Sequence, residues 1–150
     1  MSAASDFRLL PIFQAFTDQQ FERICSILDY RQLSSGETIF RQGDAAAYLY
    51  ILLKGKVAIR YKPYDGPPLN ISTILPGWIF GWSAALEKTS YSSSAIALEE
   101  SAAFSISKEY LQKICKINCD TGIIFMEMIT NCITERLESV DREIFTDTAI

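Results

Sequence analysis

The sequence predicts a mainly β fold with flanking helices, an α+β arrangement. In it a jelly-roll barrel (double-stranded β-helix) stands between an N-terminal helix and a long C-terminal helix. Short β-branched and aromatic runs, separated by glycine, proline and serine turns, extend from about residue 30 to 106, and this spacing is typical of a jelly roll. Helical periodicity replaces it from about 107 to 145. We expect one domain over residues 1–150, a length that can bury a substantial core.

The N-terminal helix is predicted by a capping box. Thr17 and Gln20 stand three residues apart, and apolar residues follow at helical spacing: Phe21, Ile24, Cys25 and Leu28. Six strands are expected after this helix, because runs of β-branched and aromatic residues are bounded there by turns. They cover residues 38–40, 48–53, 56–61, 69–75, 94–98 and 102–106, with a tight hairpin at Lys54-Gly55.

Two helices are expected after the strands. Ser107 can cap a short helix through Ile114, and Asp120 can cap a longer one that ends near Phe145 and extends roughly 38 Å. The apolar residues of the longer helix form one narrow stripe, which favours a homodimer through paired helices. The stripe comprises Ile129, Ile133, Leu137, Val140 and Ile144. The alternative is that this stripe packs back onto the β-roll.

Composition disfavours several classes of function. The net charge of −4 and the pI of about 4.8 disfavour a nucleic-acid surface, so we expect no DNA binding by this chain. The chain has no histidine and no evident nucleophile–base pair, so no catalytic residue is expected. Cys115 and Cys119 lack a further ligand pair, so no metal is expected. No signal pattern or membrane-spanning run appears, which predicts a cytoplasmic protein.

Residues 74–98 carry the main candidate site. Gly77 and Gly81 bracket an aromatic-rich turn, and small residues follow at 83–85 and 92–94. In a glycine-opened turn that leads into a short helix, unpaired backbone N–H groups and the helix dipole converge. This stretch therefore predicts a cradle for an anion.

Four segments, in this order, resemble the cyclic nucleotide-binding domains of the bacterial catabolite-activator and fumarate-nitrate-regulator family. They are RQGD at 41–44, LYILLKGKVAI at 49–59, ILPGWIFGW at 74–82 and AIALEES at 95–101. The resemblance covers roughly residues 8 to 145. It implies the jelly-roll fold, a phosphate-binding cassette at the glycine turn and dimerisation through the long helix.

The chain departs from that family at the ligand. Trp82 stands where the family has a glutamate that accepts a hydrogen bond from the ribose 2′-hydroxyl, and Tyr91 where its arginine pairs with the cyclic phosphate. Val140 and Asp141 stand where hydroxyl side chains face the base. A lost hydrogen bond to a charged group costs about 1.5–3 kcal/mol, so cyclic AMP is expected to bind about ten-fold to a hundred-fold more weakly. We also expect this chain to act without the helix-turn-helix domain of family transcription factors.

Two hypotheses follow. In the first, the chain is a regulatory module that binds a cyclic nucleotide weakly or binds another small anionic or aromatic effector. Trp82 and Tyr91 would then form the floor of the pocket and offer an N–H and an O–H group to the ligand. In the second, the two rings fill the pocket, and the chain is a scaffold that dimerises or binds a protein partner. A third interpretation is the sensor part of a transcription regulator. The expected effector site comprises Ile71, Ser72, Gly81, Trp82, Ser83, Ala84, Ala85, Tyr91, Ser92, Ser93, Val140 and Asp141.

Overall fold

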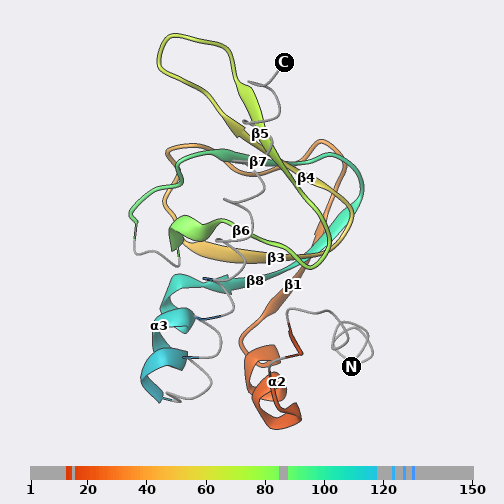
Figure 1. Ribbon diagram of the computed structural model, residues 1–150, viewed down its shortest axis with the longest axis vertical. Helices are drawn as coiled ribbons and strands as arrows, with labels where there is room; N and C mark the ends of the chain where they lie inside the picture. The colour runs from red at the N-terminus through yellow and green to blue at the C-terminus, as the bar shows by residue number, and fades with distance from the viewer. Residues whose placement is uncertain are drawn as a thin grey trace, which may run out of the picture.

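The computed structural model describes residues 13, 14, 16–84, 88–117, 123, 127 and 130. In this part of the chain, eight strands form two four-stranded antiparallel sheets, which Figure 1 shows above the two helices α2 and α3. One sheet has the strand order β1-β8-β3-β6 and the other has the order β2-β7-β4-β5. The predicted jelly roll with flanking helices is confirmed.

Each sheet draws its strands from both halves of the roll. The first sheet contains β1 (Asp29–Leu33), β8 (Ser101–Ser107), β3 (Tyr48–Lys54) and β6 (Ile79–Phe80). The second contains β2 (Thr38–Phe40), β7 (Ser94–Ala97), β4 (Val57–Tyr61) and β5 (Leu69–Ile74). The six expected strands are confirmed to within one residue at each end. Strands β1 and β6 were not predicted, because β1 is a largely polar edge strand and β6 has only two residues.

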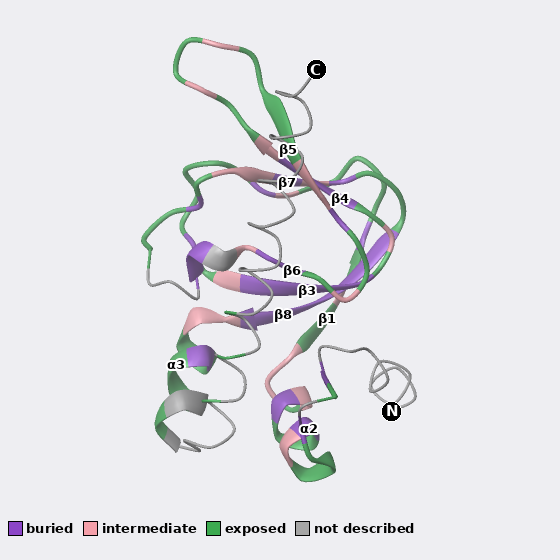
Figure 2. Cartoon of the chain, in the orientation of Figure 1, coloured by how far each residue is buried: buried purple, intermediate pink, exposed green. Residues whose placement is uncertain are grey.

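The first sheet is buried on both faces. Alternate residues of β3 point to opposite sides. Leu49, Ile51 and Leu53 pack with the helix α2 and its neighbours in one core cluster. Tyr50 and Leu52 pack in a second cluster between the two sheets. This double burial explains why β3 is a nearly continuous apolar run, and Figure 2 shows β3 and β8 as mostly buried.

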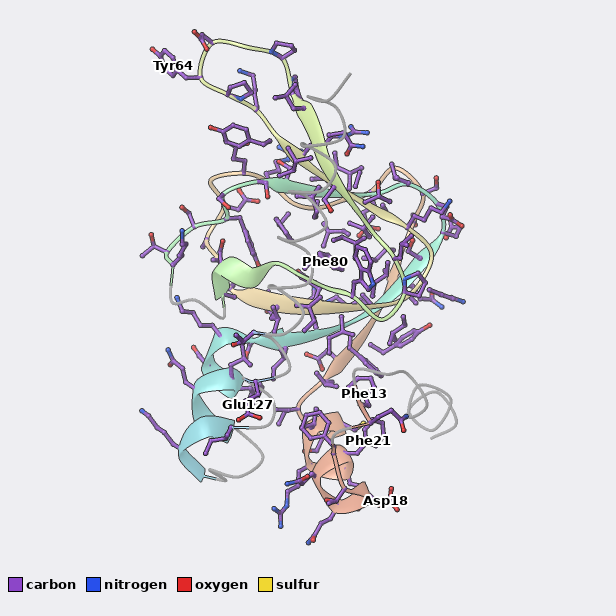
Figure 3. The ribbon with its side chains drawn as sticks, viewed as in Figure 1. Phe13, Asp18, Phe21, Tyr64, Phe80 and Glu127 are labelled. Atoms are coloured by element: carbon purple, nitrogen blue, oxygen red, sulfur yellow. The ribbon has the colours of Figure 1, made fainter. Side chains whose placement is uncertain are left out.

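Helix α2 (Asp18–Cys25) begins as predicted. The Gln20 N–H donates to Thr17 Oγ1 at 3.2 Å, and the Thr17 N–H donates to Gln20 Oε1 at 3.0 Å, so the capping box is confirmed. The helix ends at Cys25, which places Leu28 in the following turn and corrects its expected helical position. On the buried side, the rings of Phe13 and Phe21 meet edge to face at 5.2 Å (Figure 3).

Helix α3 (Lys108–Ile117) follows β8 directly and is three residues longer at its C-terminal end than predicted. The Ser107 hydroxyl accepts a hydrogen bond from the Tyr110 N–H at 3.2 Å, so the predicted cap is confirmed. The longer helix lies outside the described residues except for Ile123, Glu127 and Thr130, each of which is helical. No helix in the described ranges is both long and apolar enough to cross a membrane.

Candidate functional site

The cassette turn lies against β3, between β6 and the short 3-10 helix η2 (Trp82–Ala84). Phe80 ends β6 opposite Tyr50, and Figure 3 shows Phe80 inside the roll. Gly81 follows with φ of 78°, and a Cβ there would lie 3.1 Å from the Tyr48 carbonyl oxygen and 3.2 Å from Tyr50 Cδ2. Glycine adopts this conformation without strain and leaves that space free. Gly81 therefore allows the chain to turn closely over β3.

A cavity of about 250 Å³ opens beside this turn. Half of its lining residues are apolar or aromatic, namely Phe40, Ile59, Ile71, Phe80 and Tyr91. The other half presents polar groups or exposed backbone, from Gly81, Ser83, Lys88, Ser92 and Ser93. Pockets for drug-sized ligands measure about 300–1,000 Å³, so this cavity suits a compact molecule with both an apolar and a polar part.

The polar half of the lining carries hydrogen-bond donors that have no acceptor among the described residues. Within the described part of the chain, the backbone N–H groups of Gly81, Ser92 and Ser93 donate to no residue. Ser83 is only 8% exposed, and its hydroxyl has no partner among the described residues. A buried polar group without a partner costs about 1–3 kcal/mol, so such groups normally meet water or a ligand. These neutral donors suit an oxyanion.

Tyr91, which the resemblance noted from the sequence aligns with an arginine, is buried and neutral. Its ring stacks on Phe40 with the centroids 3.8 Å apart. Its hydroxyl accepts a hydrogen bond from the Tyr48 N–H at 3.0 Å and donates to the Tyr48 carbonyl. Burial raises the pKa of Tyr91 to about 12, outweighing the opposite effect of the bond to Tyr48. The phenol proton is thus committed to the backbone, and the expectation that this O–H is a free handle for a ligand is wrong.

Lys88 is the one cationic residue among the described lining of the cavity. Its N–H donates to the Ser83 carbonyl at 3.0 Å, and its carbonyl accepts from Lys108 Nζ at 3.0 Å, so its backbone is held on both sides. Its ammonium has no partner in the described ranges. An ammonium attracts phosphate or carboxylate as a point charge, without the fork geometry of arginine. Lys88 was not predicted, although a search of the cassette for a replacement cation would find it three residues before Tyr91.

A second cation lies among the tyrosines of the roll. The Arg31 guanidinium is 4.6 Å from the ring centroid of Tyr48 and 5.7 Å from that of Tyr50, and its Nε donates to Ser105 Oγ at 2.9 Å. Burial raises the pKa of Tyr50, and the charge of Arg31 opposes part of that rise. Arg31 has no carboxylate partner in the described part of the chain, and it does not line the cavity.

Half of the residues expected at the effector site line this cavity. They are Ile71, Gly81, Ser83, Tyr91, Ser92 and Ser93. The register of β4 and β5 shifts between Ile59 and Arg60, which leaves Ile71 as an extra residue in β5, and Ile71 contributes to the lining. Ser72, which pairs with Ile59, and Ala84, which is buried in the core between the sheets, do not line the cavity.

Other expected residues lie outside the described part of the chain. The backbone of Trp82 belongs to η2, but its side chain and all of Ala85 are outside it. So are Val140 and Asp141, and so is the expected dimer stripe of Ile129, Ile133, Leu137, Val140 and Ile144. Cys119 is outside as well. Among the residues that are described, no three histidine, cysteine, aspartate or glutamate side chains gather in a way that could hold a metal.

Comparisons with known proteins agree with this architecture. The cyclic AMP receptor protein of Thermus thermophilus is 28% identical over 108 residues, which are 71% of this chain and 50% of that protein. A solved cyclic nucleotide-binding domain from Methylobacillus flagellatus KT matches with a TM-score of 0.87 at 18% identity, over 97% of this chain and 85% of the other. The catabolite activator protein of Thermus thermophilus matches with a TM-score of 0.73 at 24% identity, over 92% of this chain and 63% of the other.

These two structures share the fold, and the chain spans half the length of the curated relative. The family profile described as cyclic nucleotide-binding domain matches residues 30–118, which is more than half of the chain. The chain therefore belongs to the family of cyclic nucleotide-binding domains.

Proposed function

We propose that this chain is a dimeric regulatory module, and that its cavity takes a compact anionic effector with an apolar or aromatic part. One observation carries the proposal. A single cavity combines the buried Ser83 hydroxyl, which has no partner among the described residues, and the Lys88 ammonium with an aromatic lining. Such donors hold an anionic group, while the rings of Phe40 and Phe80 favour an apolar part of the ligand.

The same lining favours weak binding of cyclic nucleotides. An arginine grips a phosphate through two parallel hydrogen bonds, whereas Tyr91 offers no charge and Lys88 offers one point charge. The loss of one hydrogen bond to a charged group costs about 1.5–3 kcal/mol. We therefore expect cyclic AMP and cyclic GMP to bind about ten-fold to a hundred-fold more weakly than they would with an arginine at this position.

A contact between the cassette and α3 offers a route from the cavity to the helices. Lys88 lines the cavity, and its carbonyl accepts a hydrogen bond from Lys108, the first residue of α3. An effector that draws Lys88 toward the cavity would favour one position of α3 over another. The apolar stripe of the longer helix would then carry the change to the second protomer or to a protein partner. The chain spans half the length of its curated relative, and the sensor part of a transcription regulator is one context in which this coupling between cavity and helices would act.

A scaffold function is the second candidate, and Tyr91 favours it. Its 3.8 Å stack on Phe40 and its two bonds to the Tyr48 backbone are those of a core residue that occupies former ligand space. A scaffold of this kind would bind no effector and would act through dimerisation or a protein partner.

Thermal unfolding separates the two candidates. Cyclic AMP, cyclic GMP and a panel of small aromatic carboxylates and phosphates are added to the protein, since a ligand that binds only the folded state raises the Tm. We expect at least one panel member to do so, and expect Lys88→Gln to weaken its binding about ten-fold or more in calorimetry. Lys54→Gln removes an exposed lysine outside the cavity lining and serves as the control. No Tm increase with any ligand would favour the scaffold. Equal losses of ligand affinity in Lys88→Gln and Lys54→Gln would mean that Lys88 does not contact the ligand.

A further inference from the structure

A second cavity, of about 500 Å³, lies on the outer face of the sheet β2-β7-β4-β5. Arg60 and Ser94 line it, and they pair with each other across β4 and β7. Their sequence neighbours Ile59 and Ala95 belong to the core between the sheets, and successive residues of a strand point to opposite faces. The cavity is therefore separate from the effector cavity. We call it the outer groove, and define it by Thr38, Arg41, Gln42, Arg60, Lys62 and Ser94.

The outer groove concentrates positive charge in an acidic protein. Arg41, Arg60 and Lys62 all line it, no carboxylate is among the described lining residues, and the whole chain has a net charge of −4. None of the three side chains has an ion pair or a hydrogen bond within the described part of the chain. Asp44 and Asp65 each lie three residues from one of these cations, but neither lines the groove, and Asp44 accepts a hydrogen bond from the backbone N–H of Arg41 at 3.0 Å. Three cations that share a cavity without a counter-charge repel one another, and an anion in the groove would remove that repulsion.

Hydrogen bonds hold the groove in shape. The Lys62 N–H donates to Gln42 Oε1 at 2.9 Å, and Gln42 Nε2 donates to the Lys62 carbonyl at 3.1 Å. The backbone N–H of Gln42 donates to Ser94 Oγ at 2.8 Å. These bonds fix the loop that carries Arg41 to Lys62, the residue that follows β4, and to Ser94 in β7. The Ser94 hydroxyl acts as an acceptor here, which leaves its own proton available to a ligand, since it has no acceptor among the described residues.

We propose that the outer groove binds the phosphate groups of a small polyphosphorylated molecule. Two guanidinium groups match phosphate oxygens in fork geometry, and Lys62 adds a third charge. Three cations and two hydroxyl-bearing residues suit two or three linked phosphates better than one. A nucleic acid is disfavoured, because the cations gather in one short groove of an acidic protein and do not form an extended basic stripe.

Calorimetry with inorganic triphosphate, pyrophosphate and orthophosphate tests this site. We expect triphosphate to bind most tightly, and binding to weaken as salt is raised because the groove is open to solvent. Arg60→Gln and Arg41→Gln should each weaken triphosphate binding about ten-fold or more. Arg23→Gln removes the same charge from the exposed side of α2, outside the groove, and should leave the affinity within about two-fold. Circular dichroism confirms that each variant is folded.

Three results would overturn the proposal. One is the absence of measurable triphosphate binding at low salt. Another is a loss of triphosphate affinity in Arg23→Gln equal to that in Arg60→Gln, which would mean that only the overall charge of the protein matters. The third is a loss of triphosphate affinity in Lys88→Gln with no loss in Arg60→Gln, which would mean that triphosphate binds in the effector cavity.

Discussion

Replacing Tyr91 by phenylalanine tests whether this residue belongs to the core or to the ligand site. The change keeps the ring that stacks on Phe40 at 3.8 Å and removes only the hydroxyl. The Tyr48 N–H and C=O then lose their shared partner in a half-buried position. An unpaired buried donor or acceptor costs about 1–3 kcal/mol, and a domain of this size loses about 2–4 °C in Tm per kcal/mol. We expect Tyr91→Phe to lower the free energy of unfolding by about 2 kcal/mol and the Tm by roughly 4–8 °C.

Urea unfolding followed by far-UV circular dichroism measures this loss. Tyr64→Phe is the matched control, because Tyr64 is fully exposed at the tip of the β4–β5 hairpin, where Figure 3 labels it. That variant should stay within about 0.5 kcal/mol of the wild type. If Tyr91→Phe loses no more stability than Tyr64→Phe, the Tyr91 hydroxyl does not stabilise the fold. Tyr91 would then be assigned to the ligand site and not to the core.

Tyr91 also predicts how stability depends on pH. Its folded pKa of about 12 lies above the ordinary value of 10, so the fold favours the protonated phenol. That stabilisation is complete below pH 10 and is lost as the pH rises through 12. Tyr50, whose pKa burial also raises, acts in the same direction. We expect the free energy of unfolding to fall over this range, with a smaller slope in Tyr91→Phe than in the wild type, and identical slopes would contradict the assignment.

Three further predictions concern glycine geometry, assembly and the phosphate position. Gly55→Ala should cost about 2–4 kcal/mol in urea unfolding, because φ is +95° and the new Cβ would lie 2.8 Å from Ser101 Cα. Gly36→Ala, at φ +86° with nothing within 4 Å, should cost only about 1–2 kcal/mol, and equal losses would contradict the packing argument. Leu137→Glu should shift the protein from dimer toward monomer in analytical ultracentrifugation. A wild-type protein that is already monomeric at micromolar concentration would contradict the dimer proposal. Tyr91→Arg, if circular dichroism shows it folded, should bind cyclic AMP better in calorimetry, and no gain would mean that the cradle cannot seat a phosphate.

The fold was largely predictable because its signals are local. The capping box of Thr17 and Gln20 needs only residues three apart, and turn residues mark the ends of six strands. Strand β1 escaped prediction because it pairs with β8 at the edge of the sheet and buries only Leu33 among its five residues. Its place depends on backbone pairing with a strand about seventy residues away, for which a polar sequence carries no signal.

The candidate site was predictable only in part, because distant residues complete it. Gly81 of the glycine turn and Ser92 and Ser93 of the serine run, which stand out in the sequence alone, all line the cavity. Phe40 comes from a strand about fifty residues before Tyr91, and the hydroxyl of Tyr91 bonds to Tyr48, forty-three residues away. The sequence could therefore place Tyr91 near the cavity, but it could not show that the ring faces the lining while the O–H bonds to the backbone.

We propose that an anion binds at the cassette through backbone N–H groups, the Ser83 hydroxyl and Lys88. An NMR titration of the ¹⁵N-labelled protein, with cyclic AMP and with each ligand that raises the Tm, tests it most directly. We expect saturable shifts of the amide signals of Gly81, Ser83, Ser92 and Ser93, and much weaker saturation in Lys88→Gln. Saturable binding that shifts only signals elsewhere, or the absence of any shift with every ligand, would contradict the claim.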